Sequence, residues 1–491
     1  MKKSLKKNFL LYFVKQLMSI IFPLITFTYA ARVLGVNEMG AINYSKSIIT
    51  YFTLISSFGI SNYAIREGAR IREKKKIIDK FATEMFIINI CSTAVASISA
   101  LIVINIPKFA AYKNFLCVFF LMVPFTLIGV EWVYSIFEDY FYITVRAILV
   151  QIISLCLLFL LVKSKKDSVK YVLITVVATV GSNLFNFFHS RKYIHFFENK
   201  NGTYEIKKHL TAISTVFMTT LASQIYLNMD VTMVGYMAGD YASGIYSASN
   251  KLVVTVTTLI SSLRVILLPR LSFYLSNKKT EAEFEKLNLK SSRILLCVCV
   301  PLMIGIFFLS GDAISIFCGD EYMPARLTLK ILVFGMVFSA LNGFIVYQIF
   351  MPLKKERIAL MGTIIGAIVN LTANSILIKI LKQDGAAVGT VLAEISVFIF
   401  CALMSREYIN YVSLFKVIMR YFVAGIPIAL ICVSVNCFIS NIILRVIVSI
   451  VFSACAYFIV LKIMKDEVYK TVIEPVFHSM GFIVCSWLNS K

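Results

Sequence analysis

The chain has 491 residues, of which 59% are apolar and only 15% are charged. Soluble domains carry about 25% charged residues, so this composition excludes an ordinary soluble domain and favours a membrane protein. Lysine and arginine nevertheless outnumber aspartate and glutamate by 49 to 26, which gives a net charge of +23. Most of these cations lie between the apolar segments, where they set topology, so nucleic acid is not an expected partner.

Apolar runs of about 20 residues recur along the chain, the length that crosses about 30 Å of hydrocarbon. The runs are continuous and do not alternate, which predicts helices and excludes a β-barrel. The first run is too long for a cleaved signal peptide, so we interpret it as a span. We predict about fourteen spans, at 9–33, 42–65, 81–105, 114–136, 141–162, 169–190, 210–237, 243–268, 292–310, 327–351, 358–380, 386–404, 417–439 and 442–464.

Cations concentrate in every second gap between these spans. The gaps at 66–80, 191–209 and 270–293 are rich in lysine and arginine, whereas most of the alternate gaps are poorer in them. The gap at 163–170, with four lysines, is the exception. The positive-inside rule then predicts a multi-pass protein with both termini in the cytoplasm. Residues 465–491 are expected to form a cytoplasmic or interfacial amphipathic tail.

An internal echo indicates a duplication. Residues 33–46 read VLGVNEMGAINYSK, and residues 234–251 read VGYMAGDYASGIYSASNK, about 200 residues later. Each joins an odd span to the next through a glycine turn, a second glycine, a Tyr-Ser pair and a lysine. Such repeats build transporters with the substrate path between the halves. The predicted domains are an N-lobe at 1–190, a linker at 191–209, a C-lobe at 210–407, two further helices at 408–464 and the tail.

Charged residues within or at the edges of spans are costly and often mark functional sites. Lys15, Lys46, Arg146 and Lys251 are interpreted as lying deep in the spans or near their outer ends, where they would attract a phosphate-bearing substrate. Snorkelling to headgroups or pairing with an acid remains the alternative for each. The candidate cations of the substrate path are Lys15, Arg32, Lys46, Arg66, Arg146, Lys251 and Arg264.

Three acids within spans, Glu131, Asp230 and Glu394, are expected either to pair with these cations or to carry a coupling proton. Pro23, Pro124 and Pro301 also lie inside predicted spans, where they would kink or break a helix. The chain has no glycine-rich phosphate loop, no HExxH and no GxSxG motif, so we expect a transporter and no enzyme. The 11 cysteines are scattered, and neither a disulfide nor a metal site is expected.

Several motifs, taken in order, resemble those of bacterial polysaccharide flippases, the O-antigen and capsule repeat-unit branch of the MOP exporter superfamily. The most diagnostic is the hairpin EWVYSIFEDYFYITVR at 131–146, although Ser135 and Ile136 stand where such proteins often have Gln-Gly. The other motifs are YAARVLG at 29–35, GAINYSKSI at 40–48, FGISNYAIREGARIR at 58–72, MDVTMVGYMAGDYASGIYSASNK at 229–251, LLPRLS at 267–272, GAIVNLTANSILI at 366–378 and DGAAVGTVLAE at 384–394.

The resemblance implies an all-α integral membrane fold with two six-helix lobes in a MATE-like inverted V, followed by two peripheral helices. It implies that undecaprenyl-pyrophosphate-linked oligosaccharide units move from the cytoplasmic to the outer leaflet of the bacterial inner membrane by alternating access. No cofactor is implied beyond a proton or sodium gradient. Membrane lipids, and the polymerase and chain-length proteins of the same pathway, are the other implied partners.

Other functions remain to be weighed. A MATE-type cation-coupled multidrug exporter would share the lobes, but its cavity should be acidic and aromatic. A polymerase or glycosyltransferase would need a large outer loop or a soluble domain with catalytic residues, and the longest outer gap, near 311–326, carries no such set. A purely structural scaffold would not need charges inside its spans.

Overall fold

A computed structural model describes residues 5–198, 203–276 and 281–475 of the chain. Side chains are described in these ranges except at 5–13, 15, 16, 262–276, 281–287 and 472. Every regular element in the described part is helical, which confirms the all-α fold. Eleven of the described helical segments are long and apolar enough to cross a membrane, so the protein is a multi-pass membrane protein.

Three of these segments are more than twice as long as one crossing requires. They span 55, 56 and 49 residues, and the first also includes Phe58 and Gly59 at positive φ. Inside the longest helix of each segment one residue has non-helical backbone angles, at Gly35, Gly239 and Lys382 respectively. Since a helix rises 1.5 Å per residue, each segment is long enough for two crossings that turn at that residue. The predicted total of fourteen spans stays a prediction.

The contacts divide the chain into two compact units. Unit 1 is Met1–Ser247 with Ile378–Gln383, and unit 2 is Ala248–Leu377 with Asp384–Lys491. The division falls inside a long helix and not in the linker expected at 191–209, because residues 206–247 pack on the N-terminal helix. The lobe boundaries expected from the sequence stay predictions, and residues 476–491 of the expected tail lie outside the described residues.

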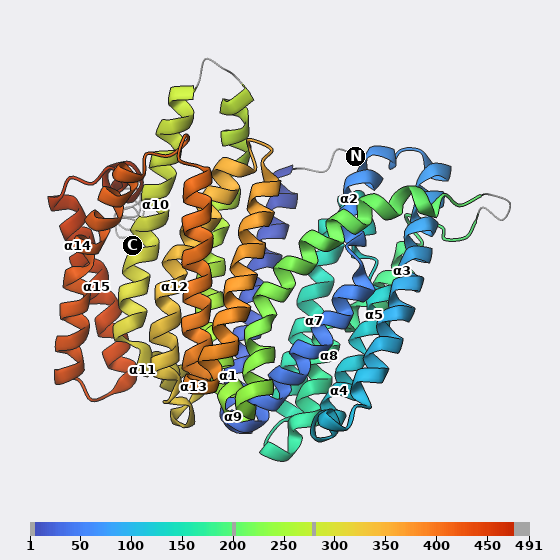
Figure 1. The fold of residues 1–491 in the computed structure, drawn as a ribbon, viewed down its shortest axis with the longest axis horizontal. Coiled ribbons are helices and arrows are strands. Elements are labelled where there is room, and N and C mark those ends of the chain that lie inside the picture. The colour runs from blue at the N-terminus through green and yellow to red at the C-terminus, as the bar shows by residue number, and fades with distance from the viewer. Residues whose placement is uncertain (1–4, 199–202, 277–280, 476–491) are drawn as a thin grey trace, which may run out of the picture. The chain divides into compact units, whose positions relative to one another are not determined.

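Unit 1 is built around the long N-terminal helix α1, which packs against α3, α5 and α7 (Figure 1). Its elements are α1 (Leu5–Ser57), α2 (Ile60–Ile71), α3 (Lys75–Ile104), η1 (Pro107–Tyr112), α4 (Lys113–Phe120), α5 (Met122–Leu127), α6 (Glu131–Ile136), α7 (Tyr140–Leu161), η2 (Lys165–Asp167), α8 (Ser168–Ser190) and the first part of α9 (Ile206–Ser276).

In unit 2, α10 packs against α12 and α14, and α14 packs against α15 (Figure 1). Its elements are the rest of α9, α10 (Glu281–Phe308), α11 (Ser310–Cys318), η4 (Asp320–Tyr322), α12 (Ala325–Ile345), η5 (Val346–Phe350), α13 (Glu356–Met404), α14 (Tyr411–Phe438), α15 (Ile442–Ile463) and η6 (Tyr469–Ile473).

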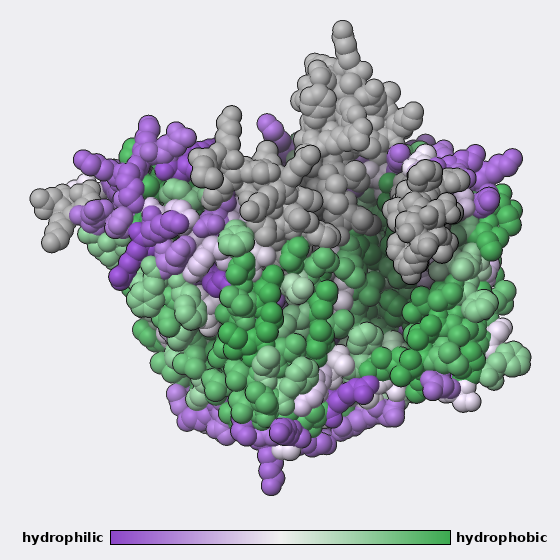
Figure 2. Space-filling view, turned by 180° about the vertical axis from the view of Figure 1, so that it is seen from behind, coloured by the Kyte–Doolittle hydropathy of each residue, from purple (hydrophilic) through white to green (hydrophobic). Residues whose placement is uncertain are grey.

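Apolar side chains cover the middle of the helices on the face shown in Figure 2, and hydrophilic side chains gather at the helix ends. Many large apolar side chains of the described residues are exposed, such as Ile380 at 71% and Leu160 at 66%. The surface of a soluble protein is mainly polar, whereas this surface is apolar around the middle of the helices. It is suited to contact with the hydrocarbon chains of lipids.

The two ends of unit 1 can be told apart by their contacts. At one end Arg72 donates to Glu138 at 2.7 Å, and Lys80 pairs with Glu205 at 3.4 Å. We call this the basic end, because the cation-rich gaps at 66–80 and 191–209 both lie there. At the opposite end the Tyr29 hydroxyl donates to the Val162 carbonyl at 2.8 Å.

Two of the predicted kinks behave differently from expectation. Pro23 and Pro301 lie inside continuous helices, α1 and α10. Pro124 lies where the expected span 114–136 is divided into α4, α5 and α6, since a proline removes one helical hydrogen bond and suits a first turn. The second predicted span also ends early, because Phe58 and Gly59 both adopt positive φ angles, of 45° and 71°.

Glycine allows α1 and α9 to cross closely in unit 1. A Cβ atom at Gly40 would lie 1.8 Å from the Asp240 backbone oxygen, and one at Gly244 would lie 2.2 Å from the Val36 oxygen. The contact is reciprocal. Asp240 follows Val36 by 204 residues, and Gly244 follows Gly40 by the same 204 residues, so each glycine meets the counterpart of the other's partner. The kinks obey the same offset: Gly35 has φ 80° and ψ 177°, and Gly239 has φ 85° and ψ −178°.

Candidate functional site

The diagnostic hairpin brings two predicted site residues together in unit 1. Glu131 begins the short helix α6, and Arg146 lies about two turns into α7, whose N-cap is Asp139. A guanidinium nitrogen of Arg146 donates to Glu131 Oε2 at 3.3 Å. The Arg146 side chain is only 8% exposed, whereas that of Glu131 is 40% exposed. This pair fits the alternative in which an intramembrane acid pairs with a cation.

Arg146 nevertheless keeps unused hydrogen-bonding capacity. Its Nε and Nη1 atoms are buried and have no hydrogen-bond partner in the described part of the chain. Its guanidinium carbon lies 5.7 Å from the centre of the Tyr142 ring, within the range of a cation–π contact. A buried guanidinium with two unpaired nitrogens can take an anionic oxygen at little further desolvation cost.

Aromatic rings support this pair from the basic end. Tyr142 stacks on His189 with ring centres 4.0 Å apart, and Tyr134 donates to the Asn186 carbonyl at 2.6 Å. Tyr193 donates to Asp139 at 2.6 Å, and burial together with this carboxylate raises the pKa of Tyr193, so its hydroxyl stays protonated. The ring contacts hold the start of α7 and the end of α8 in one register.

Lys46 lies deep in α1. The helix resumes directly after Gly35, so Lys46 is near the middle of the segment 36–57 and not at its outer end, as the sequence suggested. It is half-buried, and among the described residues no carboxylate pairs with it. Beside it, the Thr232 hydroxyl donates to Ser47, the next residue in α1, at 2.9 Å. The same Thr232 hydroxyl lies 3.2 Å from the hydroxyl of Tyr51, about one turn further along α1. Lys46 therefore adjoins a polar strip between α1 and α9.

Arg146 and Arg32 lie near opposite ends of unit 1. The helix of Arg146 starts at the basic end of unit 1, beside Arg72 and Glu138, whereas Arg32 lies near the opposite end and Lys46 lies between. The reason is the direction of the chain: α7 runs away from the basic end, so an early residue in it lies near that end. Lys251 belongs to unit 2, where it is half-buried and engaged in a contact.

Two acids are held by neutral partners. Asp230, which is 5% exposed, accepts a hydrogen bond of 2.7 Å from Tyr246 across the Gly239 kink in unit 1. Glu394 in unit 2 accepts 2.8 Å from the Asn342 amide. The sequence did not single out Tyr246 or Asn342, since their roles depend on how distant helices pack.

The remaining predicted cations lie apart. Arg66 is exposed and pairs with Glu67 at 3.0 Å near the basic end, as the snorkelling interpretation allows. Arg32 is exposed and engaged in a contact. The side chains of Lys15 and Arg264 lie outside the described residues. In unit 1 the structure thus pairs Glu131 with Arg146, and Lys46 lies at a separate place on α1.

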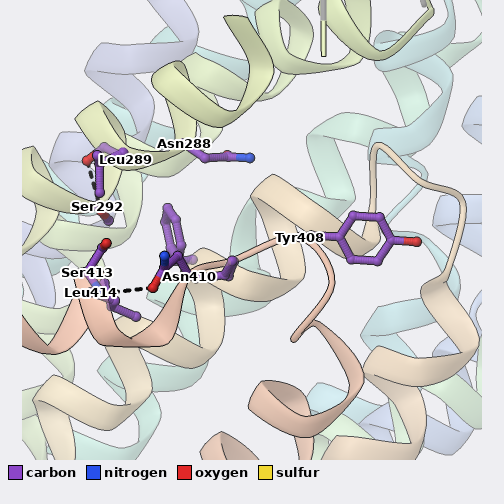
Figure 3. Close-up of a pocket in the computed structure, with 9 residues that line it drawn as sticks. Asn288, Leu289, Ser292, Tyr408, Asn410, Ser413 and Leu414 are labelled. Atoms are coloured by element: carbon purple, nitrogen blue, oxygen red, sulfur yellow. Dashed lines mark hydrogen bonds between the residues drawn. The ribbon is translucent and has the colours of Figure 1, made fainter. Parts of the chain in front are cut away.

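Unit 2 contains a mainly apolar pocket with a few polar side chains, which the sequence did not indicate (Figure 3). It lies where α10, the 405–410 connection and α14 meet, and it is lined by Asn288, Leu289, Ser292, Phe344, Tyr408, Ile409, Asn410, Ser413 and Leu414. No motif could have revealed it, because its residues come from three separate parts of the sequence.

The fold is that of solved integral membrane transporters. Over 93% of the chain, the structure is similar to a lipid II flippase MurJ in an inward-closed conformation, with a TM-score of 0.73, 17% identity and 98% of that chain covered. It is also similar, over 83% of the chain, to an outward-facing MATE family multidrug resistance transporter, with a TM-score of 0.55, 15% identity and 96% of that chain covered.

The sequence narrows this class. Residues 5–275 match the family model described as polysaccharide biosynthesis protein, and the chain belongs to that family. A Shigella dysenteriae protein named "Putative O-antigen transporter" is 21% identical over 404 residues, which cover 81% of this chain and 98% of that protein. The resemblance drawn from the motifs is therefore confirmed, and the protein is a transporter and not an enzyme.

Proposed function

We propose that the protein is a flippase that moves polyprenyl-pyrophosphate-linked oligosaccharide units from the cytoplasmic to the outer leaflet by alternating access through a cationic cavity, for surface polysaccharide assembly. Its membership of the polysaccharide biosynthesis family supports this function. So do the names of its relatives, an O-antigen transporter and a lipid II flippase.

The observation that carries the proposal is Lys46, a cation near the middle of a crossing helix without a carboxylate partner among the described residues. An unneutralised charge in a span is costly unless a ligand or water stabilises it. A pyrophosphate supplies the opposite charge. Arg146 adds two unpaired guanidinium nitrogens in the same unit, and Glu131 would moderate the affinity so that the substrate can leave.

We assign the basic end of unit 1 to the cytoplasm by the positive-inside rule, so both termini are cytoplasmic in a bacterial inner membrane. The oligosaccharide would be delivered there and released on the other side. The polymerase and chain-length proteins of the pathway are proposed to receive it.

Proton or sodium movement is proposed to drive transport. Asp230 and Glu394 are the candidate coupling groups, because each carboxylate is held by a neutral donor, Tyr246 or Asn342. No resident cofactor is needed for this mechanism.

The test measures surface polysaccharide in a flippase-deficient host. Lys46→Glu should lower export by about tenfold or more, since loss of a charge-assisted contact costs about 1.5–3 kcal/mol. Lys207→Glu is the matched control, because Lys207 is an exposed lysine near the basic end. Normal export with Lys46→Glu at wild-type protein level would contradict the proposal. Charge reversals at Lys15 and Lys251 extend the series.

A charge exchange separates substrate binding from structure at the hairpin. Arg146→Glu alone should lose both stability and export, because it faces Glu131. The double variant Glu131→Arg with Arg146→Glu restores the pair, so protein level should recover. If transport needs a cation at position 146, export by the double variant should stay low. Recovery of both protein level and export would assign the pair a structural role.

The rival function is a MATE-type multidrug exporter, which the likeness to a MATE transporter favours. Overexpression would then raise resistance to cationic drugs. We expect no such resistance, because Lys46 and Arg146 would repel a cationic substrate. Strong resistance together with normal polysaccharide in a deletion strain would favour the rival.

A further inference from the structure

The pocket in unit 2 continues into a second, basic pocket. The first has a volume of about 80 Å³ and the second about 210 Å³, and they share Leu289 and Ser413. Both open where α14 begins, beside the connection that follows Met404. All their described residues belong to unit 2, and none of them is among the intramembrane charges assigned to the substrate path.

The Asn288 side chain indicates that the first pocket takes a ligand. It is 4% exposed, yet neither its amide nitrogen nor its amide oxygen has a hydrogen-bond partner in the described chain. A buried amide without partners costs about 1–3 kcal/mol, which a folded protein rarely tolerates. In Figure 3 this amide extends away from Leu289 and Ser292. A ligand with hydroxyl groups would satisfy both of its atoms.

The rest of the first pocket suits a sugar. Tyr408 and Phe344 supply aromatic surface for the apolar face of a ring. The Asn410 side-chain oxygen accepts from the Ser413 backbone nitrogen at 3.1 Å, which caps α14 and leaves the Asn410 amide group as a donor. Lys355 donates to the Tyr408 hydroxyl at 2.9 Å and fixes that ring. Few polar groups among apolar surface is the usual design of a small-molecule site.

The second pocket supplies positive charge beside it. Arg293, Lys416 and Arg420 line it together with one acid, Asp466. Arg420 Nε lies 3.2 Å from Asp466, and Arg293 pairs with the exposed Glu467. Lys416 is exposed and has no carboxylate partner among the described residues. One cation of this pocket is thus left for an anion, with two guanidinium groups beside it.

We propose that the two pockets form one binding site for a glycosyl phosphate, with the sugar against Asn288 and Tyr408 and the phosphate against Lys416 and Arg293. The site rests on the proposed function for its biological ligand, which would be the sugar-phosphate headgroup of a lipid-linked oligosaccharide. All its residues belong to unit 2, and none of them is a candidate cation of the substrate path, so we propose that it holds a headgroup apart from that path.

The experiment measures equilibrium binding and needs no transport. The full-length protein in phosphatidylcholine nanodiscs is titrated with glucose 1-phosphate by calorimetry. Asn288→Ala and Lys416→Ala should each weaken binding about tenfold, as expected for one lost polar contact with a charged ligand. Asn186→Ala is the matched control, because Asn186 is also fully buried with both amide atoms unpaired but lies in unit 1. Lys462→Ala, an exposed lysine of α15, controls for surface charge.

A second arm identifies the source of the ligand. Nanodiscs are doped with phosphatidylinositol, a lipid whose headgroup joins a phosphate to a hydroxylated ring, and the retained lipid is counted by native mass spectrometry. Retention that Asn288→Ala abolishes assigns the site to lipid headgroups. Binding of glucose 1-phosphate without retention of the lipid assigns it to soluble sugar phosphates.

The proposal is overturned if the wild-type protein binds neither probe, or if Asn288→Ala and Lys416→Ala leave binding unchanged. Asn288 donates to no group in the part of the chain that the structure describes, so its alanine variant should fold. Lys46→Glu should not change this affinity. If Lys46→Glu abolishes export while glucose 1-phosphate fails to bind, this site is wrong and the flippase function stands. If glucose 1-phosphate binds normally while export does not depend on Lys46, the binding site stands and the proposed flippase mechanism is wrong.

Discussion

The helical segments that follow Gly35 and Gly239 have the same backbone geometry at their start, but they carry different polar and charged side chains. Both glycines adopt backbone angles that other residues rarely reach, and both precede a second glycine by five residues. With this register, however, Lys46 corresponds to Asn250, and Lys251 corresponds to Ser47. Lys46 and Lys251, the lysines of the two repeated motifs, therefore differ by one position in the alignment that superposes the glycines. One position is about 100° of rotation around a helix, so the two lysines lie on different helix faces.

The difference shows which features a duplication retains. The kink and the close crossing depend on backbone geometry, which tolerates only glycine, so both copies keep them. The charges depend on what each copy contacts. In the second copy Asp240 accepts a hydrogen bond of 2.8 Å from Tyr112, while its counterpart Val36 has an apolar side chain. The two halves thus keep the same backbone geometry at the glycine kink, but the polar side chains beside it differ between them.

The largest effect should come from filling the crossing itself. Gly40→Ala or Gly244→Ala places a methyl group about 2 Å from a backbone oxygen, and the helices must separate. We expect each to lower stability by about 3 kcal/mol, at the upper end of overpacking costs. Thermal unfolding in detergent, followed by size-exclusion chromatography, measures it.

Gly305→Ala is the control for that pair, since a Cβ at Gly305 meets no atom within 4 Å. It should be neutral or stabilising, because alanine favours a helix by up to about 1 kcal/mol. Equal melting temperatures for all three variants would mean that the crossing is not tight.

A smaller effect is expected at the kinks. Gly239→Ala meets no atom within 4 Å, so its cost comes only from the positive φ of 85°, about 2 kcal/mol. Gly35→Ala should cost a similar amount if the two turns are equivalent. A clear difference between the two melting temperatures would show that the copies have diverged in backbone geometry also.

The smallest effect concerns the polar contact that one copy alone has. Tyr112→Phe removes the hydrogen bond to Asp240 and should cost about 1 kcal/mol. The double variant Tyr112→Phe with Asp240→Val imitates the first copy, so it should recover part of the loss. A double variant no more stable than Tyr112→Phe would contradict this account of the divergence.

Composition and periodicity predicted the all-helical membrane fold, because burial in hydrocarbon requires long apolar runs. The start of the second span was wrong by several residues, since Asn37 and Glu38 interrupt the apolar run but not the helix. Hydropathy reports contact with lipid, whereas helix continuity depends on backbone hydrogen bonds. A single glycine such as Gly35 is then enough to reverse the chain where a loop was expected.

The candidate site was partly predictable. Glu131 and Arg146 flank one short hairpin, so their pairing could be anticipated from 15 residues of separation. Asp230 and Tyr246 are as close in sequence, but they meet only because Gly239 folds α9 back on itself. Asn288 and Asn410 are 122 residues apart, and no local pattern relates them.

The reciprocal contact at the α1–α9 crossing has the form of an isologous interface, in which two copies of one patch meet across a two-fold axis. The hypothesis that follows is that a half-length ancestor assembled as a parallel homodimer through this patch before its gene was fused in tandem. Separately expressed halves, cut in the 191–209 loop, should then reassemble in the membrane. Failure of Gly40→Ala to weaken that reassembly would argue against this origin.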